Sequence, residues 1–275
     1  MIKLQREMPQ DYNLFLFGDD HEGVTLRDQE LWGKLIDMMH QKIEGCKVNF
    51  GVDHGDIVEA IAIDDPRFDG LTTEGKVLNQ IQQAIKNREA IKKNLIGICE
   101  GNHPLKLWRF GRITEHICNE LKVPYLSWSA ILDYTHKKQT VFRHYCAHGF
   151  KAINSSMPDL HDRRLAMERS LRRQLQYKAH NCHLMSIGHS HRLIISEPQF
   201  LYDPETGHRI ESLSLAEKYV PAKDRWFVNT GSFYKSMGTG FSGYAEIKGY
   251  DPMRTGFALA IVRNKKIIEI RKIFT

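Results

Sequence analysis

The sequence predicts an α/β fold, because short apolar runs of strand length alternate with longer segments whose apolar residues recur at helical spacing. Polar clusters that contain Gly, Asp, Asn or His directly follow the predicted strands. In open α/β sheets, binding sites form beyond the carboxyl ends of the strands. We therefore expect the fold to bring these clusters together at one edge.

The first half of the chain is predicted to contain strands and helices in turn. Three apolar runs have the length of buried strands: Leu14–Phe17, Val48–Val52 and Leu95–Cys99. Three longer segments have apolar residues at helical spacing: Leu26–Ile43, Lys76–Lys93 and Leu105–Leu121. Each of the three predicted strands is followed by a polar turn.

The second half is predicted to add strands, a basic helix and a closing hairpin. The strands are Val141–Ala147, His183–Ile187 and Trp226–Val228. A basic segment at about 154–180 contains a helical pattern over His161–Lys178. The hairpin joins Phe257–Val262 to Lys266–Phe274. Since no repeat or linker interrupts the chain, we expect a single domain over residues 1–275, with its C-terminal strands after residue 226.

Composition indicates the class of protein. A chain of 275 residues, 41% hydrophobic and 26% charged, can bury a large core. No apolar run approaches the roughly 20 residues that span a bilayer, and the charged N-terminus lacks a signal-peptide pattern. We therefore expect a cytoplasmic protein with no membrane partner. The five cysteines form no CxxC pair, which disfavours a zinc ribbon and a disulfide framework.

Five polar clusters contain the side chains that bind transition metals. They are Asp19-Asp20-His21, Gly55-Asp56-Ile57-Val58-Glu59, Gly101-Asn102-His103, His148-Gly149 and Gly188-His189-Ser190-His191. Imidazole and carboxylate together suit Mn, Fe, Zn and similar ions, whereas Ca and Mg prefer oxygen ligands alone. Glycine permits the backbone angles that turn a side chain back into a site. One such cluster arises by chance, but the whole series in this order predicts a metal centre.

This series of motifs resembles the calcineurin-like metallophosphoesterase superfamily. The matching motifs are DxH, GDxxE, GNH, HG and GHxH, and they lie between Leu14 and His191. The segment Asn229-Thr230-Gly231-Ser232 also resembles that family's NPGS-like strand end. The resemblance implies a four-layer αββα sandwich, in which two mixed β-sheets pack face to face with helices outside.

The resemblance also implies a role for each motif residue. Two divalent cations are expected, with Mn²⁺ favoured and Fe, Zn or Ni accepted by the same ligands. The implied ligands are Asp19, His21 and His191 for one ion, Asn102, His148 and His189 for the other, and Asp56 as a bridge between both. A metal-bridging hydroxide would attack phosphorus, His103 would protonate the leaving group as general acid, and Glu59 would orient His103.

Some positions depart from the family's pattern or have a rival. Pro104 stands where the family often has Asp or Glu, which puts more weight on Glu59. His54 replaces a residue that is usually apolar. It either contacts substrate or is a strand-end residue that hydrogen-bonds to the backbone. His148 is preferred to His144 as the ligand, because a glycine follows it at the end of the apolar run.

Two positions favour a phosphodiester substrate. The Ser/Thr protein phosphatase branch of the family grips a phosphate dianion with arginines, which suit that task. This sequence has Ala60 and Glu100 at those positions. We therefore expect a metal-dependent phosphodiesterase that acts on nucleotides or nucleic acid, such as a DNA nuclease. The formal net charge of +6 agrees with a polyanionic partner.

Several basic residues are candidate substrate contacts. Arg109 and Arg112 follow the GNH motif in a segment where aromatic residues alternate with cations, as in surfaces that bind single strands. The alternative for this segment is an amphipathic helix. The predicted basic helix is either a nucleic-acid contact or a solvated face. Arg192, beside the last motif, and Lys235, together with Ser232, are further candidates for phosphate contacts.

Two other functions remain open. A phosphomonoesterase for phosphoproteins or small metabolites would use the same metal centre. A non-catalytic nucleic-acid-binding scaffold is disfavoured by the complete ligand set, because a scaffold does not need every ligand. The sequence leaves open the oligomeric state, the choice between endonuclease and exonuclease action, and the role of the Gly-rich residues 238–243, a candidate loop over the pocket.

Overall fold

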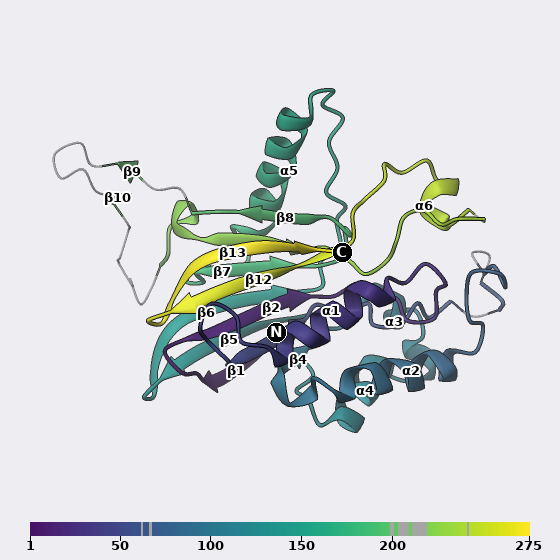
Figure 1. The fold of residues 1–275 in the computed structure, drawn as a ribbon, viewed down its shortest axis with the longest axis horizontal. Coiled ribbons are helices and arrows are strands. Elements are labelled where there is room, and N and C mark those ends of the chain that lie inside the picture. Colours follow the sequence, from purple (N-terminus) through teal and green to yellow (C-terminus); the bar gives the residue numbers. More distant parts are fainter. Residues whose placement is uncertain (62, 66–67, 199–200, 203–208, 211–218, 241) are drawn as a thin grey trace.

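The computed structural model describes residues 1–275 except 62, 66–67, 199–200, 203–208, 211–218 and 241. Within the described residues, the strands form two large mixed sheets that pack face to face (Figure 1). Helices cover the outer side of each sheet. The predicted four-layer αββα sandwich is therefore confirmed.

The first sheet has six strands in the spatial order β1 (Ile2–Glu7), β5 (Ser129–His136), β6 (Gln139–Ala147), β7 (Leu184–Ile187), β11 (Trp226–Thr230) and β8 (Leu193–Ser196). Strands β6, β7 and β11 run parallel, so their carboxyl ends lie at one edge. The sequence analysis missed β1, β5 and β8. β1 is a largely exposed edge strand, β5 alternates between buried and partly exposed residues, and β8 is short.

The second sheet has the spatial order β13 (Lys266–Phe274), β12 (Gly256–Arg263), β2 (Tyr12–Phe17), β3 (Asn49–Asp53) and β4 (Leu95–Ile98). Strands β2, β3 and β4 run parallel. The predicted hairpin of β12 and β13 is confirmed, and Asn264 and Lys265 at its turn have positive φ angles, as a two-residue hairpin turn requires. A separate antiparallel pair joins β9 (Leu201–Tyr202) to β10 (Arg209–Ile210).

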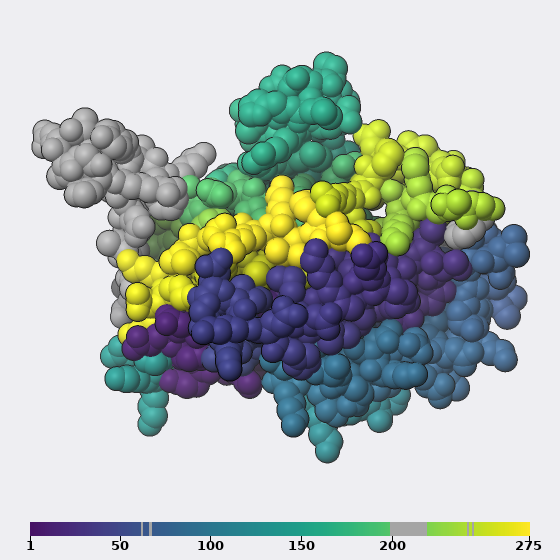
Figure 2. Space-filling view, viewed as in Figure 1, coloured from purple at the N-terminus to yellow at the C-terminus, as the bar shows by residue number. Residues whose placement is uncertain are grey.

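Strand β2 shows how the layers form, because it is buried on both faces. Side chains alternate along a strand, so Leu14 and Leu16 pack against the other sheet while Phe15 and Phe17 pack against helices. The helices on that side are α1 (Gln29–His40), α2 (Val77–Glu89) and α4 (Ile113–Leu121). On the opposite side, helix α5 (Leu160–Leu175) packs on the first sheet and projects from the surface (Figure 2).

The predicted helix over Leu105–Leu121 is wrong, because this segment is divided. It contains the end of α3 (Asn102–Leu105), a short 3₁₀ helix (Trp108–Phe110) and α4. Gly111 has a φ of +136°, which ends the 3₁₀ helix and reorients the chain before α4. Two groups on either side of this break, the Trp108 indole and the Thr114 hydroxyl, donate hydrogen bonds to Glu100.

Helices α3 and α6 (Tyr244–Ile247) both lie toward the right-hand end of the strands in Figure 1. At the same end in Figure 2, residues near 240–250 lie over residues of the N-terminal third. In the part of the chain that the structure describes, every helix falls short of the length and apolarity needed to cross a membrane.

Candidate metal centre

The polar turns after five strands meet at one edge of the sandwich. Their side chains are Asp19 and His21 after β2, Asp56 after β3, Asn102 after β4, His148 after β6, and His189 and His191 after β7. Several of these turns use a left-handed backbone: φ is positive at Asp19, His21, Asp56, His189 and His191. Residues other than glycine seldom adopt this conformation, and such strain is concentrated at functional sites.

The first group of donor atoms comprises Asp19, His21 and His191. The Nε2 atoms of the two histidines lie 2.9 Å apart. The Asp19 Oδ1 atom lies 3.5 Å from Nε2 of His191 and 4.0 Å from Nε2 of His21. Ligands that each lie about 2.1 Å from one ion are about 3–4 Å from one another, so this group matches the spacing of a shared cation.

The second group comprises Asp56, His148 and His189, with Asn102 beside them. Nε2 of His148 lies 3.2 Å from Oδ2 of Asp56 and 2.8 Å from Oδ1 of Asn102. The same Asn102 oxygen lies 2.7 Å from Nδ1 of His189. Because Oδ2 of Asp56 is also 3.9 Å from Nε2 of His21, the Asp56 carboxylate lies between the two groups.

Hydrogen bonds fix which nitrogen of two histidines faces the centre. Nδ1 of His148 donates to the backbone carbonyl of His54 at 2.8 Å, and this carbonyl can only accept. Nδ1 of His21 lies 2.6 Å from Oε2 of Glu59. Whenever either ring is neutral, its Nε2 lone pair therefore points into the centre, toward oxygens and another imidazole. Such a convergence of electron pairs suits a divalent cation.

Two glycines let the carboxylates lie directly against the backbone. A Cβ atom added to Gly101 would lie 2.1 Å from Oδ1 of Asp56. A Cβ atom added to Gly188 would lie 2.6 Å from Oδ2 of Asp19. Any larger residue at either position would displace the carboxylate, so both motifs need glycine for steric reasons.

The electrostatics of the centre keep its carboxylates ionised. Burial raises the pKa of Asp56, but His148 and His103 outweigh this effect and hold the pKa well below its usual range. Burial lowers the pKa of His148, but the Asp56 carboxylate outweighs it and raises the pKa to about 9. The Glu59 carboxylate likewise raises the pKa of His21 to about 9 against the effect of burial. The site thus strongly favours positive charge beside its carboxylates.

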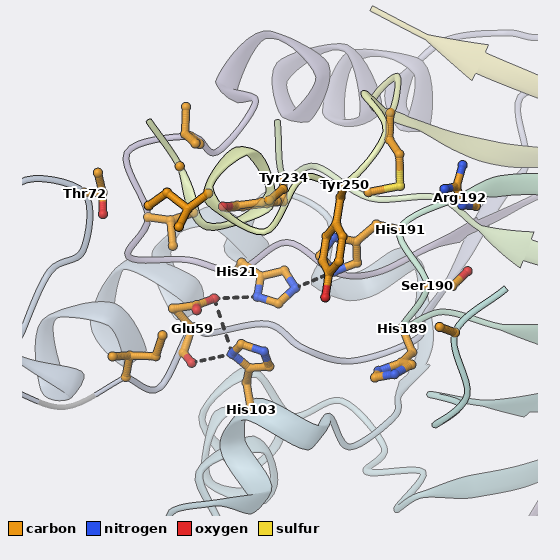
Figure 3. A pocket seen from close by; sticks show the side chains of 18 of the residues that line it. His21, Glu59, Thr72, His103, His189, Ser190, His191, Arg192, Tyr234 and Tyr250 are labelled. Atoms are coloured by element: carbon orange, nitrogen blue, oxygen red, sulfur yellow. Dashed lines mark hydrogen bonds and ion pairs between the residues drawn. The ribbon is translucent and has the colours of Figure 1, made fainter. Parts of the chain in front are cut away.

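His103 lies next to the first group, and Glu59 lies between His103 and His21 (Figure 3). Nδ1 of His103 donates to the backbone carbonyl of Glu59 at 2.7 Å and lies 3.3 Å from its carboxylate. The carboxylate is closer to His21, at 2.6 Å. Glu59 therefore contacts both imidazoles, orienting His103 mainly through its backbone and His21 through its side chain.

A buried ionic network behind the ligand turns was missed by the sequence analysis. Arg88 of α2 pairs with Asp53 at 2.9 Å and with Asp20 at 3.1 Å. Asp20 also pairs with Arg27 at 2.5 Å. The two aspartates lie next to the motif residues in sequence. Arg88 could not be recognised as their partner, because it lies 35 positions from Asp53 and 68 positions from Asp20.

Of the two roles predicted for His54, the structure supports the strand-end residue bonded to the backbone, because its side chain is fully buried and lies outside the pocket lining. Its Nδ1 lies 3.1 Å from the carbonyl oxygen of Phe17, and its Nε2 lies 2.6 Å from the Ser186 hydroxyl. Burial lowers the pKa of His54 to about 4, so the ring is neutral. His144 bonds to the same hydroxyl at 2.5 Å and lies outside the metal groups.

Other candidate contacts also lie away from the pocket. The guanidinium groups of Arg109 and Arg112 lie over the rings of Phe110 and Trp108, and neither arginine lines the pocket. Lys235 lies 3.6 Å from Asp28 and outside the pocket lining.

Two polar residues that the sequence analysis placed near the substrate have structural roles instead. Ser232 is buried and donates to the backbone carbonyl of Asp19. Glu100 is also buried and accepts hydrogen bonds from Trp108 and Tyr125. The Glu100 carboxylate thus bonds to neighbouring side chains instead of lining the pocket.

A pocket of about 590 Å³ lies over the two groups of donor atoms. Its floor includes His21, His103, His189 and His191, and its positively charged lining side chains, among the described residues, are Lys106 and Arg192. The predicted position of Arg192 at the site agrees with this lining. Ser242 and Gly243 line the pocket too, whereas residue 241 of the Gly-rich stretch lies outside the described residues.

The centre combines two groups of metal-binding side chains, a neighbouring imidazole and a pocket large enough for an organic substrate. Such an arrangement can hold divalent cations and place a substrate beside them. No model of a known protein family matches the sequence, and no curated protein matches it either. The residues and their geometry carry the functional argument.

Proposed function

We propose that this chain is a metal-dependent phosphodiesterase of the calcineurin-like metallophosphoesterase superfamily that acts on nucleotides or nucleic acid. The observation that carries the proposal is the position of Asp56, whose Oδ2 lies 3.2 Å from Nε2 of His148 and 3.9 Å from Nε2 of His21. A carboxylate shared between two ligand groups suits a pair of cations. Mn²⁺ is favoured, and Fe, Zn or Ni suit the same ligands.

Each cation would have its own ligands and share Asp56. One would be held by Asp19, His21 and His191, the other by Asn102, His148 and His189. When bound, such cations lower the pKa of a water molecule and neutralise charge on phosphoryl oxygens. The chain orients its own ligands: the Glu59 carboxylate bonds to Nδ1 of His21, and the His54 carbonyl bonds to Nδ1 of His148.

His103 is suited to protonate the leaving group. Its Nδ1 is occupied by the hydrogen bond to the Glu59 carbonyl, so its Nε2 is the atom that gains and loses a proton. The residue lines the pocket beside the metal ligands. The Asp56 carboxylate accepts from the backbone N–H of His103 at 2.8 Å, which fixes the imidazole relative to the shared ligand.

The charges of the pocket favour a diester, which carries one negative charge, over a monoester dianion. Ala60 is buried, and Glu100 bonds away from the pocket, so neither position supplies a cation. Lys106 and Arg192 nevertheless line the pocket. Because these two cations can also attract a dianion, phosphomonoester hydrolysis is the second candidate.

A comparison of two chromogenic esters tests the substrate class. In the presence of Mn²⁺, we expect the purified protein to hydrolyse bis-p-nitrophenyl phosphate faster than p-nitrophenyl phosphate. Asp56→Asn should abolish both reactions, whereas His116→Ala, a change at an exposed histidine far from the centre, should leave them intact. Monoester hydrolysis without diester hydrolysis would establish the second candidate instead. Nucleic-acid binding with no hydrolysis under Mn, Fe, Zn or Ni would point to a scaffold.

Metal content tests the centre independently of turnover. Isothermal titration should give two Mn²⁺ ions per chain. His191→Ala removes a ligand of one group only, so one of the two sites should weaken by at least roughly the 10–100-fold seen when even indirect ligand contacts are removed. A single ion per wild-type chain, or unchanged titration of His191→Ala, would contradict the two-ion assignment.

A further inference from the structure

The pocket has two unlike ends. In Figure 3, Thr72 lies at one end and Arg192 with Ser190 at the other, and His21 and His103 lie between them. The candidate metal centre is thus in the middle of the floor rather than at the bottom of a funnel. A substrate bound across the centre therefore extends toward both ends, as a diester with two substituents does.

The end near Thr72 has an apolar wall. Val24 pairs with Thr73 in a short antiparallel bridge, and the backbone N–H of Thr25 donates to the Thr72 carbonyl at 2.9 Å. The apolar side chains that line the pocket include Val24, Leu26, Ile61 and Ala245. We call these four residues the apolar wall. Nothing in the proposed chemistry at phosphorus requires them, because phosphoryl oxygens need polar and charged partners.

The apolar wall is built by segments far apart in sequence that touch closely. A Cβ atom added to Gly243 would lie 2.4 Å from Cδ1 of Leu26, so the segment that carries Ala245 packs directly on the first segment. Further sides of the same pocket are formed by Asp69, Thr72 and Thr73 and by Ala152, Asn154 and Ser155. The whole pocket, about 590 Å³, is in the size range of sites that enclose an organic ligand.

An aromatic side chain connects the apolar wall to the centre. The Tyr234 ring lines the pocket, and its centroid lies 5.8 Å from that of His21 and 5.7 Å from that of His191. A planar group in the apolar half of the pocket would therefore contact both the wall and this aromatic face. Nucleobases combine flat apolar faces with polar edges, and aromatic side chains bind them without regard to sequence.

We infer that the apolar wall binds an unpaired nucleobase of the substrate, next to the scissile phosphate. Lining residues from several segments surround this part of the pocket, so a base paired in a duplex would have to leave its stack to enter. The substrate class is thus a nucleotide at a strand end or within a single strand. This inference rests on the proposed phosphodiesterase function and names the substrate of the same site.

Two diesters with the same leaving group test the inference. Thymidine 5′-(4-nitrophenyl phosphate) carries a nucleoside, whereas methyl 4-nitrophenyl phosphate does not. We expect kcat/KM to be at least roughly tenfold higher for the nucleoside ester, as a well-filled apolar pocket provides. Val24→Trp fills the apolar wall, so the ratio of the two kcat/KM values should fall to near one. Equal values for the wild-type protein would overturn the inference.

A matched control separates filling the pocket from adding a large residue. Leu71→Trp places the same side chain on the neighbouring loop, where Leu71 is exposed and outside the pocket lining. This variant should keep the wild-type ratio. If Leu71→Trp changes the ratio as much as Val24→Trp, the effect does not come from the apolar wall and the inference fails.

A binding measurement on the wild-type, metal-free chain needs no variant and no turnover. The probe is a dinucleotide that contains 2-aminopurine, whose fluorescence falls when the base stacks on an aromatic ring. We expect saturable quenching, reversed by a single-stranded oligonucleotide and not by a blunt hairpin duplex. No quenching, or equal competition by the duplex, would overturn the inference.

Different results would contradict the phosphodiesterase proposal and the base-binding inference. If neither ester is hydrolysed with any of the four metals while the probe still binds, the phosphodiesterase proposal fails and the base-binding pocket stands. If both esters are hydrolysed with equal efficiency, the phosphodiesterase proposal stands and the base-binding inference fails.

Discussion

The guanidinium group of Arg88 and the carboxylate of Asp53 form an ion pair that is closed off from solvent, with Nη2 and Oδ2 2.9 Å apart. Arg88 also reaches Asp20, next to Asp19 in sequence, at 3.1 Å. One side chain from α2 thus neutralises acids at the ends of β2 and β3. The network holds the turns that carry Asp19 and Asp56 against each other without entering the pocket.

Removing this cation should strongly destabilise the fold. Arg88→Met leaves two buried carboxylates without their partner, and breaking a buried pair in this way costs about 3–5 kcal/mol. Urea denaturation should show this loss in the free energy of unfolding. Lys92→Met, which removes an exposed pair with Glu89, should cost no more than about 1 kcal/mol. Similar losses in both variants would mean that the Arg88 network is not coupled to folding.

Gly101→Ala should impair the metal centre because the added methyl group crowds both the side chain and the backbone of Asp56. The φ of Gly101 is −125°, which any residue adopts, but an added Cβ would meet Asp56 at 2.1 Å. A ligand displaced by about 1 Å can cost roughly a hundredfold in rate, so we expect such a loss in kcat together with weaker Mn²⁺ binding.

Gly33→Ala is the matched control for that change, because a Cβ at this position in α1 meets nothing within 4 Å. Alanine is favoured over glycine in a helix by about 1 kcal/mol, so this variant should be fully active and slightly more stable. Full activity and normal metal content in Gly101→Ala would show that Asp56 does not depend on this close contact.

His103→Ala should affect substrates according to their leaving groups. An alkoxide needs protonation, so kcat on a dinucleotide should fall by about 10²–10⁴-fold. A 4-nitrophenolate leaves without a proton, so hydrolysis of its esters should fall much less. Steady-state kinetics on both substrates measures the difference. An equal loss on both would argue that His103 acts on transition-state charge and not as a general acid.

Asp28 should make stability depend on pH. Burial raises its pKa, but hydrogen bonds from Thr255 and from the Leu31 amide outweigh burial and lower the pKa below its ordinary value. A lowered pKa means that the folded state favours the carboxylate. The contribution is therefore complete above the ordinary pKa, about 3.9, and is lost as the pH falls through the folded-state pKa.

The variant Asp28→Asn isolates this contribution, because asparagine still caps α1 but carries no charge. Its free energy of unfolding should lie about 1 kcal/mol below the wild-type value at pH 7, and the gap should narrow as the pH falls below about 4. Glu30→Gln, an exposed acid in the same turn, should show no such gap. A gap that is constant with pH would mean that the Asp28 charge has no role.

Much of the frame could be predicted from the sequence, because three of the strands that lead into the polar turns of the candidate site are fully buried. β2, β4 and β7 are buried along their full length, so each reads as a continuous apolar run. The residues after them stand out as polar clusters with glycine. Because these strands are buried on both faces, their apolar runs can be recognised in the sequence, and the polar clusters of the candidate site are found directly after them.

Other features leave no such trace in the sequence. β1 is an exposed edge strand with a charged sequence, so no apolar pattern marks it. The break at Gly111 was masked by apolar residues at helical spacing on both sides. His54 looked like a site residue because of its neighbours, but only the packing of the two sheets shows that it bonds to Ser186, 132 positions away. Pairings between distant segments decide the cases of β1, which pairs with β5, and of His54.

The order in which the sheets are completed has a consequence for the growing chain. Strand β2, which leads into Asp19 and His21, pairs with β12 at residues 258–262. Ribosomes add about 5–20 residues per second, so the first ligands emerge many seconds before that partner strand exists. His191 likewise emerges long after Asp19. The nascent chain therefore exposes its first acidic and imidazole turns before their later partners exist, and the proposed cation centre cannot be complete until His191 has been synthesised.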